Sequence, residues 1–215
     1  MKPNKYSIPL LIALFAACVF LIQQTTDSFH ADEGRLIARA DTSRDAVVLR
    51  WSSEVEAPMG RRFEEAYDEW RDRVSLFIIE LDSPGGALAE GKRVIEAVDR
   101  MKRTHNVETR VRSWEKCLSM CVPIFLKGDR RVAAANSRWM FHEPTSYDAV
   151  TGERVDEPEF ERRYVADRFF DRYFANSPMT PEWRAWLQQE WVGKDVWKSG
   201  RDLYKEGSGV VTELE

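Results

Sequence analysis

Apolar and polar residues follow two alternating patterns along residues 46–215, and together they predict strands that alternate with helices. Continuous apolar runs at 46–51 (AVVLRW) and 74–81 (VSLFIIEL) are typical of strands buried in a sheet. Residues 60–73 and 87–102 instead place their apolar side chains at helical spacing, so that one face of each helix can pack on the sheet. Strands followed by helices in this order indicate an α/β domain.

The second half of the chain continues this order with shorter elements. A strand is expected over 107–113, followed by a turn over the first residues of CLSMC and a short buried helix over 120–128. The remaining expected elements are two short strands in RRVAAA and SRWMFH, helices over 158–175 and 180–191 with Thr180 as cap, then a helix ended by Gly207 and a final strand.

The first 31 residues have the pattern of an export segment. Lys2 and Lys5 precede an uncharged stretch from Tyr6 to Gln24, and acidic residues begin only at Asp27. This order of charges places the N-terminus inside and the rest of the chain across a membrane. The apolar part is short for a spanning helix and long enough for the core of a signal peptide. Both interpretations mean export, and the lack of an A-x-A cleavage site favours an uncleaved anchor.

These patterns divide the chain into three parts. We expect a signal-anchor or signal-peptide segment with juxtamembrane residues over 1–31, a polar linker over 32–45 and one domain over 46–215. The net charge of -4 arises from intermixed signs, so nucleic acid is not expected as a partner. Cys18 in LFAAC faintly resembles a lipoprotein processing site, but the apolar run continues beyond it.

A glycine pair, Gly85 and Gly86 in DSPGG, stands between the strand at 74–81 and the next helix. Two glycines let the backbone turn sharply, and they expose amide N–H groups near a helix N-terminus, where developing negative charge is stabilised. A tight turn that needs positive φ accounts for the same residues. The pair alone therefore leaves both interpretations open.

Ser119 stands between two cysteines where a strand is expected to pass into a helix. A hydroxyl at that position suits the nucleophile of an acyl-transfer reaction, and it equally suits a helix cap. On a regular helix, Cys117 and Cys121 would have Cα atoms about 6 Å apart, within the range of a disulfide. They form either a disulfide, in an oxidising compartment, or two buried thiols. Without a second ligand pair nearby, they do not indicate a zinc site.

His142 is the histidine best placed to act with this serine. It ends the apolar strand in WMFHEP, near the rim of the sheet, where a general base and a structural histidine both fit. His30 lies beside the export segment and His105 in a polar turn. If the chain has a serine–histidine pair, the pair is Ser119 with His142.

Three stretches, DSPGGALAEG, CLSMCVPIFLKGDRRVAAANSRWMFHEP and DVWKSGRDLYKEG, follow the order and approximate spacing of the Clp protease proteolytic subunit family (ClpP). The resemblance covers roughly residues 46–214. It implies a ClpP/crotonase-like fold, with a mostly parallel sheet built from repeated β-β-α units and helices packed outside.

The same resemblance implies the roles of the site residues: Ser119 as nucleophile, His142 as base and Asp195 as the residue that orients the histidine. The backbone amides of Gly86 and Met120 would form the oxyanion hole, supported by Gly85. Asp202 and Asp171 are the alternative aspartates for the role assigned to Asp195.

The chain also departs from the family pattern. Asp82 replaces the usual asparagine before S-P-G-G, and Cys117 and Cys121 replace small residues. With the export segment, these features are similar to those of membrane-anchored or periplasmic ClpP-like proteins of bacteria. We therefore expect a single-pass protein of the bacterial inner membrane with its C-terminal domain in the periplasm, or a periplasmic protein if the signal is cleaved.

The resulting hypothesis is an exported serine endopeptidase that acts on peptides or proteins without a cofactor or metal. Its expected partners are the membrane, through the N-terminal segment, and further copies of the same chain, through the helix at 158–175. The first alternative is a non-catalytic or weakly catalytic ClpP-fold module for binding or assembly, because a fold does not prove an activity. The second is a crotonase-like acyl-CoA enzyme, which the serine and histidine placement and an exported location disfavour.

Overall fold

A computed structural model describes residues 36–145, 151, 153, 155 and 157–215 of the 215-residue chain. Its elements are β1 (Ile37–Asp41), β2 (Ala46–Trp51), α2 (Met59–Trp70), β3 (Leu76–Leu81), α3 (Leu88–Met101), β4 (Asn106–Val111), β5 (Lys116–Leu118), α4 (Cys121–Phe125), β6 (Arg130–Ala133), β7 (Arg138–Phe141), α5 (Glu159–Tyr173), α6 (Pro181–Glu190), β8 (Val196–Ser199), α7 (Gly200–Lys205) and β9 (Glu213–Leu214).

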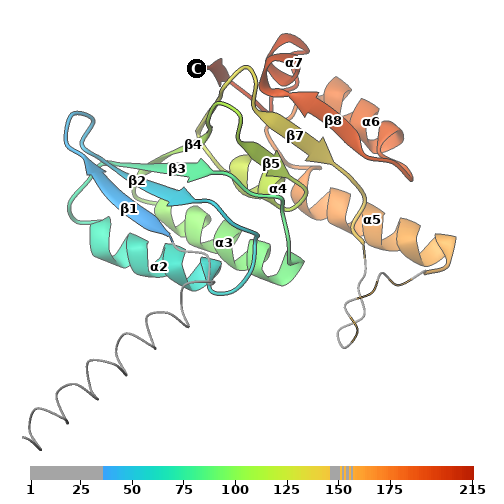
Figure 1. Ribbon diagram of the computed structural model, residues 1–215, viewed down its shortest axis with the longest axis horizontal. Helices are drawn as coiled ribbons and strands as arrows, with labels where there is room; N and C mark the ends of the chain where they lie inside the picture. The colour runs from blue at the N-terminus through green and yellow to red at the C-terminus, as the bar shows by residue number, and fades with distance from the viewer. Residues whose placement is uncertain (1–35, 146–150, 152, 154, 156) are drawn as a thin grey trace, which may run out of the picture. The chain divides into compact units, whose positions relative to one another are not determined.

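The strands form two sheets (Figure 1). The larger sheet has the order β1-β2-β3-β4-β6-β9, and all of its pairs are parallel except the antiparallel pair β1–β2. The smaller sheet has the order β5-β7-β8, in which β5 and β7 run parallel and β8 runs antiparallel to β7. The prediction of an α/β domain with a mostly parallel sheet is confirmed.

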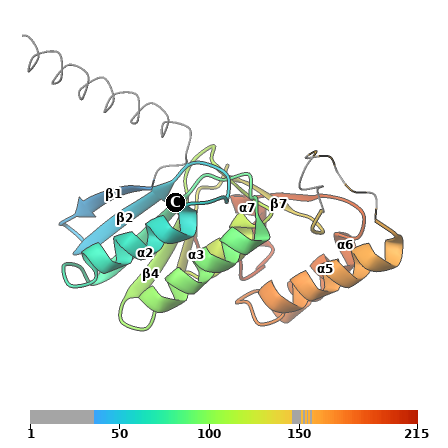
Figure 2. The same cartoon turned by 90° about the horizontal axis from the view of Figure 1, so that it is seen from below.

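The core lies between the larger sheet and the helices α2 and α3, which pack side by side (Figure 2). Alternate residues of the central strands enter it because successive side chains of a strand point to opposite faces. The buried residues of this layer include Val47, Leu49, Phe77, Ile79, Phe63 of α2 and Val94 of α3. The opposite face of the same strands has a small buried hydrophobic cluster of Ala46, Val48 and Ile78, and it also buries the carboxylates of Glu80 and Glu108.

The sequence interpretation missed three strands. The expected linker over 32–45 contains β1, whose residues are mostly exposed and therefore show no apolar periodicity; pairing with β2 holds it in place. The expected turn around Ser119 contains β5, and β8 precedes the last helix. All three strands are short or exposed; β1 pairs with the next strand, whereas β5 and β8 both pair with β7, which lies 20 or more residues away from each of them in the sequence.

One buried carboxylate joins the strands of the larger sheet. Glu108 on β4 accepts hydrogen bonds from Arg44 at 2.8 Å, from Arg130 at 2.6 Å and from Arg110. Burial alone would raise the pKa of Glu108, but the three guanidinium groups outweigh burial and lower the pKa to about 2. Glu108 therefore stays ionised inside the fold.

The predicted export segment lies outside the described residues. Within the part of the chain that the structure describes, no helix has the length and apolar character needed to cross a membrane.

Candidate active site

Ser119 lies in a sharp bend between β5 and α4. Its φ is +52°, a left-handed conformation that a residue with a Cβ rarely adopts and that costs roughly 1–2 kcal/mol. Surrounding hydrogen bonds hold it there: the Ser119 nitrogen donates to the carbonyl of Met140 at 2.9 Å, and the Val122 nitrogen donates to the carbonyl of Ser119 at 3.0 Å. Such strain is typical of functional residues, and Ser119 is not a helix cap, because α4 has no side-chain cap bond.

His142 faces this serine from the neighbouring strand. β5 pairs with β7 so that Leu118 lies opposite Met140, and the chain continues to Ser119 on one strand and to His142 on the other. The His142 Nε2 atom lies 2.7 Å from the Ser119 Oγ atom. When Nε2 carries no proton, the serine hydroxyl donates to it, which is the arrangement required for general-base activation of a nucleophile.

The glycine turn packs directly against the serine. Gly85 has φ +91° and Gly86 has φ +148°. A Cβ on Gly85 would lie 2.6 Å from the Cβ of Ser119 and 3.0 Å from the Met120 nitrogen, so only glycine permits this approach. Val55 fixes the other side of the turn, since its nitrogen donates to Gly85 and its carbonyl accepts from Ala87, both at 2.7 Å.

The two predicted oxyanion donors are available. Among the described residues, neither the backbone N–H of Gly86 nor that of Met120 has a backbone or side-chain acceptor. A cavity of about 480 Å³ opens over Ser119, His142 and the glycine turn, and its wall also includes Glu54, Leu88 and Thr145. The arrangement has a nucleophile, a base and free amides beside one hollow, as acyl transfer requires.

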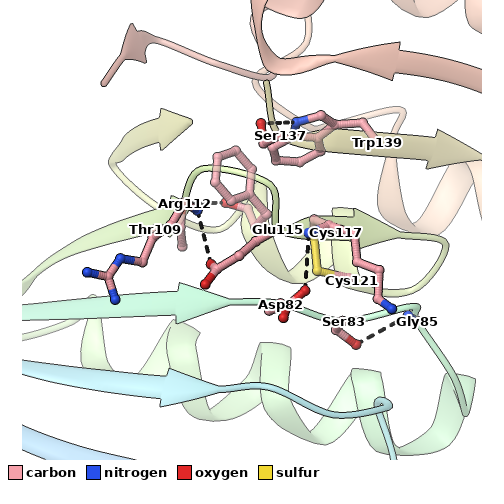
Figure 3. The surroundings of a disulfide bond; sticks show 12 residues. Asp82, Ser83, Gly85, Thr109, Arg112, Glu115, Cys117, Cys121, Ser137 and Trp139 are labelled. Carbon is pink, nitrogen blue, oxygen red and sulfur yellow. Dashed lines mark hydrogen bonds between the residues drawn. A yellow bond between two sulfur atoms is a disulfide. The ribbon is translucent and has the colours of Figure 1, made fainter. Parts of the chain in front are cut away.

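Cys117 and Cys121 form a disulfide across the serine, with Cα atoms 5.2 Å apart. The two cysteines do not lie on one regular helix: Cys117 lies on β5 and Cys121 is the first residue of α4. Figure 3 shows the disulfide next to the Ser83–Gly85 turn. There Asp82 accepts a hydrogen bond from the Lys116 nitrogen at 3.2 Å, which also ties the turn to β5.

Asp195 lies next to the histidine strand. It directly precedes Val196, which pairs with Phe141, and Phe141 directly precedes His142. The Asp195 side chain is exposed, and among the described residues no hydrogen bond or ion pair joins it to His142. His142 has a further interaction besides the one with Ser119.

Asp202 and Asp171, the alternative candidates for the third catalytic residue, lie elsewhere in the fold. Asp202 takes part in a capping box at the start of α7: its carboxylate accepts from the Ser199 nitrogen at 3.0 Å, and its own nitrogen donates to the Ser199 hydroxyl at 3.1 Å. The bond from the Ser199 hydroxyl lowers the pKa of Asp202. Asp171 lies exposed on α5. Of the three, Asp195 lies at the end of the β7–β8 pair where Val196 pairs with Phe141, the residue directly before His142.

Two supporting residues escaped the sequence analysis. The Ser83 hydroxyl accepts from the Gly85 nitrogen at 3.2 Å, and Val55 pairs with the glycine turn in a parallel bridge. Ser83 lies inside the quoted DSPGG motif, but nothing in the sequence indicates which atom its hydroxyl contacts. In the described ranges, no three histidine, cysteine, aspartate or glutamate side chains gather where they could hold a metal ion.

Comparison of the sequence with protein-family models and with curated proteins finds no match. Comparison of the structure with solved structures finds a mutant of ClpP1 from Listeria monocytogenes, with a TM-score of 0.59 and 16% sequence identity. The match covers 80% of this chain and 92% of that one. At this identity the similarity shows the fold, and the chain is a mixed α/β protein with a ClpP-like fold and a mostly parallel sheet.

Proposed function

We propose that this protein is an exported serine peptidase. The observation that carries the proposal is the 2.7 Å contact between Ser119 Oγ and His142 Nε2. Beside it lies a glycine turn in which, among the described residues, the Gly86 N–H has no acceptor. The ClpP-like fold and the three family motifs support the same reaction class. A core serine or a helix cap would need neither the left-handed backbone at Ser119 nor the cavity above it.

The reaction follows the chemistry of acyl transfer. Ser119 attacks the carbonyl carbon of a peptide bond while His142 accepts the hydroxyl proton, and the Gly86 and Met120 amides donate to the oxygen that becomes negative. His142 then gives the proton to the leaving amine. Water, deprotonated by the same histidine, releases the acyl group and restores Ser119. Asp195 orients the imidazole and stabilises its charged form.

Labelling of the full-length protein with a fluorophosphonate probe tests the proposal. We expect labelling of the wild type, loss of labelling in Ser119→Ala, and wild-type labelling in Ser113→Ala, which removes an exposed hydroxyl bonded to Asn136. Equal signal from wild type and Ser119→Ala would reject the peptidase and leave the two alternatives, a ClpP-fold binding module and a crotonase-like enzyme.

Export is part of the same proposal. The charge pattern of residues 1–31 supports a bacterial inner-membrane anchor with the domain in the periplasm, and a disulfide at Cys117 and Cys121 suits an oxidising compartment. Added protease should digest the domain in spheroplasts but not in intact cells, and digestion only after cell lysis would contradict export. The intact mass of the purified protein distinguishes an uncleaved anchor from a removed signal peptide.

We also propose that the protein forms a homo-oligomer through α5. This helix buries Ala166, Phe169 and Phe170 in its own domain, but Phe160 and Tyr164 are 71% and 60% exposed. Two large aromatic side chains one turn apart on an exposed face suit an interface between subunits.

A further inference from the structure

The Cys117–Cys121 disulfide encloses the nucleophile within a ring of five residues. Cys117 pairs with Trp139 of β7, and Cys121 begins α4, so the bond joins the incoming strand to the outgoing helix. Both cysteines are fully buried. Ser119 is the central residue of the enclosed segment and the one with positive φ.

Backbone hydrogen bonds also hold this bend, but they leave the serine side chain unconstrained. The Ser119 nitrogen bonds to Met140 and the Ser119 carbonyl accepts from Val122, but the Ser119 side chain must remain free to react. A non-glycine residue leaves the left-handed region when its surroundings allow it, because its Cβ is crowded there. A covalent link between the two flanking elements restricts that rearrangement, since the strand and the helix cannot move apart.

The same strand also carries the oxyanion turn. The Ser83 nitrogen donates to the Lys116 carbonyl at 2.8 Å, and the Leu118 nitrogen donates to the Ser83 carbonyl at 3.0 Å. The Ser83 hydroxyl in turn accepts from the Gly85 nitrogen. A shift of Cys117 would therefore be transmitted both to the serine and to the glycine turn that packs against it.

We infer that Cys117 and Cys121 are positioning residues for catalysis, whose bond keeps the Ser119 hydroxyl facing His142 and the Met120 amide facing the oxyanion. This inference rests on the proposed peptidase function. Neither cysteine lines the cavity over Ser119, so the bond acts on the chemical step rather than on substrate binding.

The kinetic test compares full-length wild type with the Cys117→Ala/Cys121→Ala double variant. A misplacement of the reacting group by about 1 Å lowers rate by about 100-fold, so we expect kcat and the rate of fluorophosphonate labelling to fall about 10- to 100-fold. KM for a fluorogenic peptide should change less than about threefold, because the cavity wall is intact. Wild-type kcat in the double variant would overturn the inference.

Two controls separate positioning from lost stability. Val107→Ala removes buried volume on β4, away from Ser119, and should lower the melting temperature without lowering kcat at a temperature where the protein is folded. The pair Cys117→Val/Cys121→Ala restores buried volume without the bond, and it should remain as slow as the double alanine variant. Recovery of kcat in this pair, or failure of both disulfide-free pairs to fold, would assign the bond to packing or stability and overturn the positioning role.

Hydrogen–deuterium exchange provides a readout that does not depend on activity. Without the disulfide, the amides of Ser119 and Val122 should exchange at least about tenfold faster, while those of β2 and β3 stay unchanged. Unchanged exchange at both amides would overturn the inference even if the wild type proves inactive. Absence of labelling in the wild type would instead contradict the peptidase, so the two failures are distinguishable.

Discussion

The Nε2 atom of His142 lies 2.7 Å from the Oγ atom of Ser119, although the two residues are 23 positions apart in the sequence. Parallel pairing of β5 and β7 produces this contact, since both strands lead to the same end of the smaller sheet. The contact between Ser119 and His142 depends on the structure around both residues. The pairing register, the left-handed serine and the close approach of Gly85 are each required for it.

Replacing the base should slow the reaction strongly. His142→Gln removes the group that takes the serine proton, and we expect kcat for peptide hydrolysis to fall about 10²- to 10⁴-fold with little change in KM. His105→Gln is the matched control. His105 directly precedes β4 and contacts the Arg71 carbonyl, away from Ser119. Full activity of His142→Gln would remove this histidine from the mechanism.

The contact between Gly85 and Ser119 predicts a second loss of activity. In Gly85→Ala the new methyl group would lie 2.6 Å from the Ser119 Cβ and 2.7 Å from the Leu118 carbonyl oxygen, so the serine must shift and kcat should fall at least about 100-fold.

Gly207→Ala separates the effect of contact from the effect of backbone strain. Gly207 also has positive φ, +60°, but nothing lies within 4 Å of an added Cβ. It should lose only about 1 kcal/mol of unfolding free energy and keep wild-type kcat. Equal kcat in the two alanine variants would show that the approach of Gly85 to Ser119 is unimportant for activity.

Asp195 is expected to orient His142 during the reaction. Asp195→Asn keeps the size of the side chain and removes its charge, so kcat should fall at least about tenfold while the melting temperature stays within a few degrees. Asp171→Asn, on the exposed face of α5, should leave kcat unchanged. A fully active Asp195→Asn variant would contradict its role as the third residue.

The buried Glu108 predicts a pH-dependent stability. Its pKa is about 2 in the folded protein and 4.5 in a free side chain, so the ionised group stabilises the fold above about pH 4.5. This contribution, about 3 kcal/mol, is lost as pH falls from 4.5 towards 2. Urea unfolding of the wild type should therefore show a decline in this range that Glu108→Gln lacks.

Glu108→Gln should also lower the free energy of unfolding at pH 7 by about 3 kcal/mol, because three arginines lose their shared carboxylate. Glu65→Gln is the control, since Glu65 pairs with Arg61 on the exposed surface of α2 and should change stability by less than about 1 kcal/mol. Parallel pH profiles of wild type and Glu108→Gln would contradict the assignment.

The exposed aromatics of α5 predict the state of assembly. Light scattering of the full-length protein, in mild detergent, should give an oligomer for the wild type and a smaller species for Phe160→Glu/Tyr164→Glu. Tyr204→Glu, an exposed aromatic on α7, should keep the wild-type mass. A wild-type monomer would contradict assembly through α5.

Local patterns in the sequence were sufficient for the main elements. The run at 46–51 became β2 with the expected bounds, and the helical spacing over 87–102 became α3, because burial of one face is recorded in the periodicity of the residues themselves. The motifs also singled out Ser119 and His142 as a pair. These features depend on residue type and spacing, which a sequence states directly.

The tertiary structure decided the features that depend on contacts between one segment of the chain and another. Pairing with other strands stabilises β1, β5 and β8. Their own residues show too little apolar periodicity to predict them as strands. Three further features could not be predicted from the sequence. They are the disulfide between Cys117 and Cys121, the left-handed backbone at Ser119 and the place of Asp202 in a helix cap. Each depends on the distance and direction between groups that only the packed chain brings together.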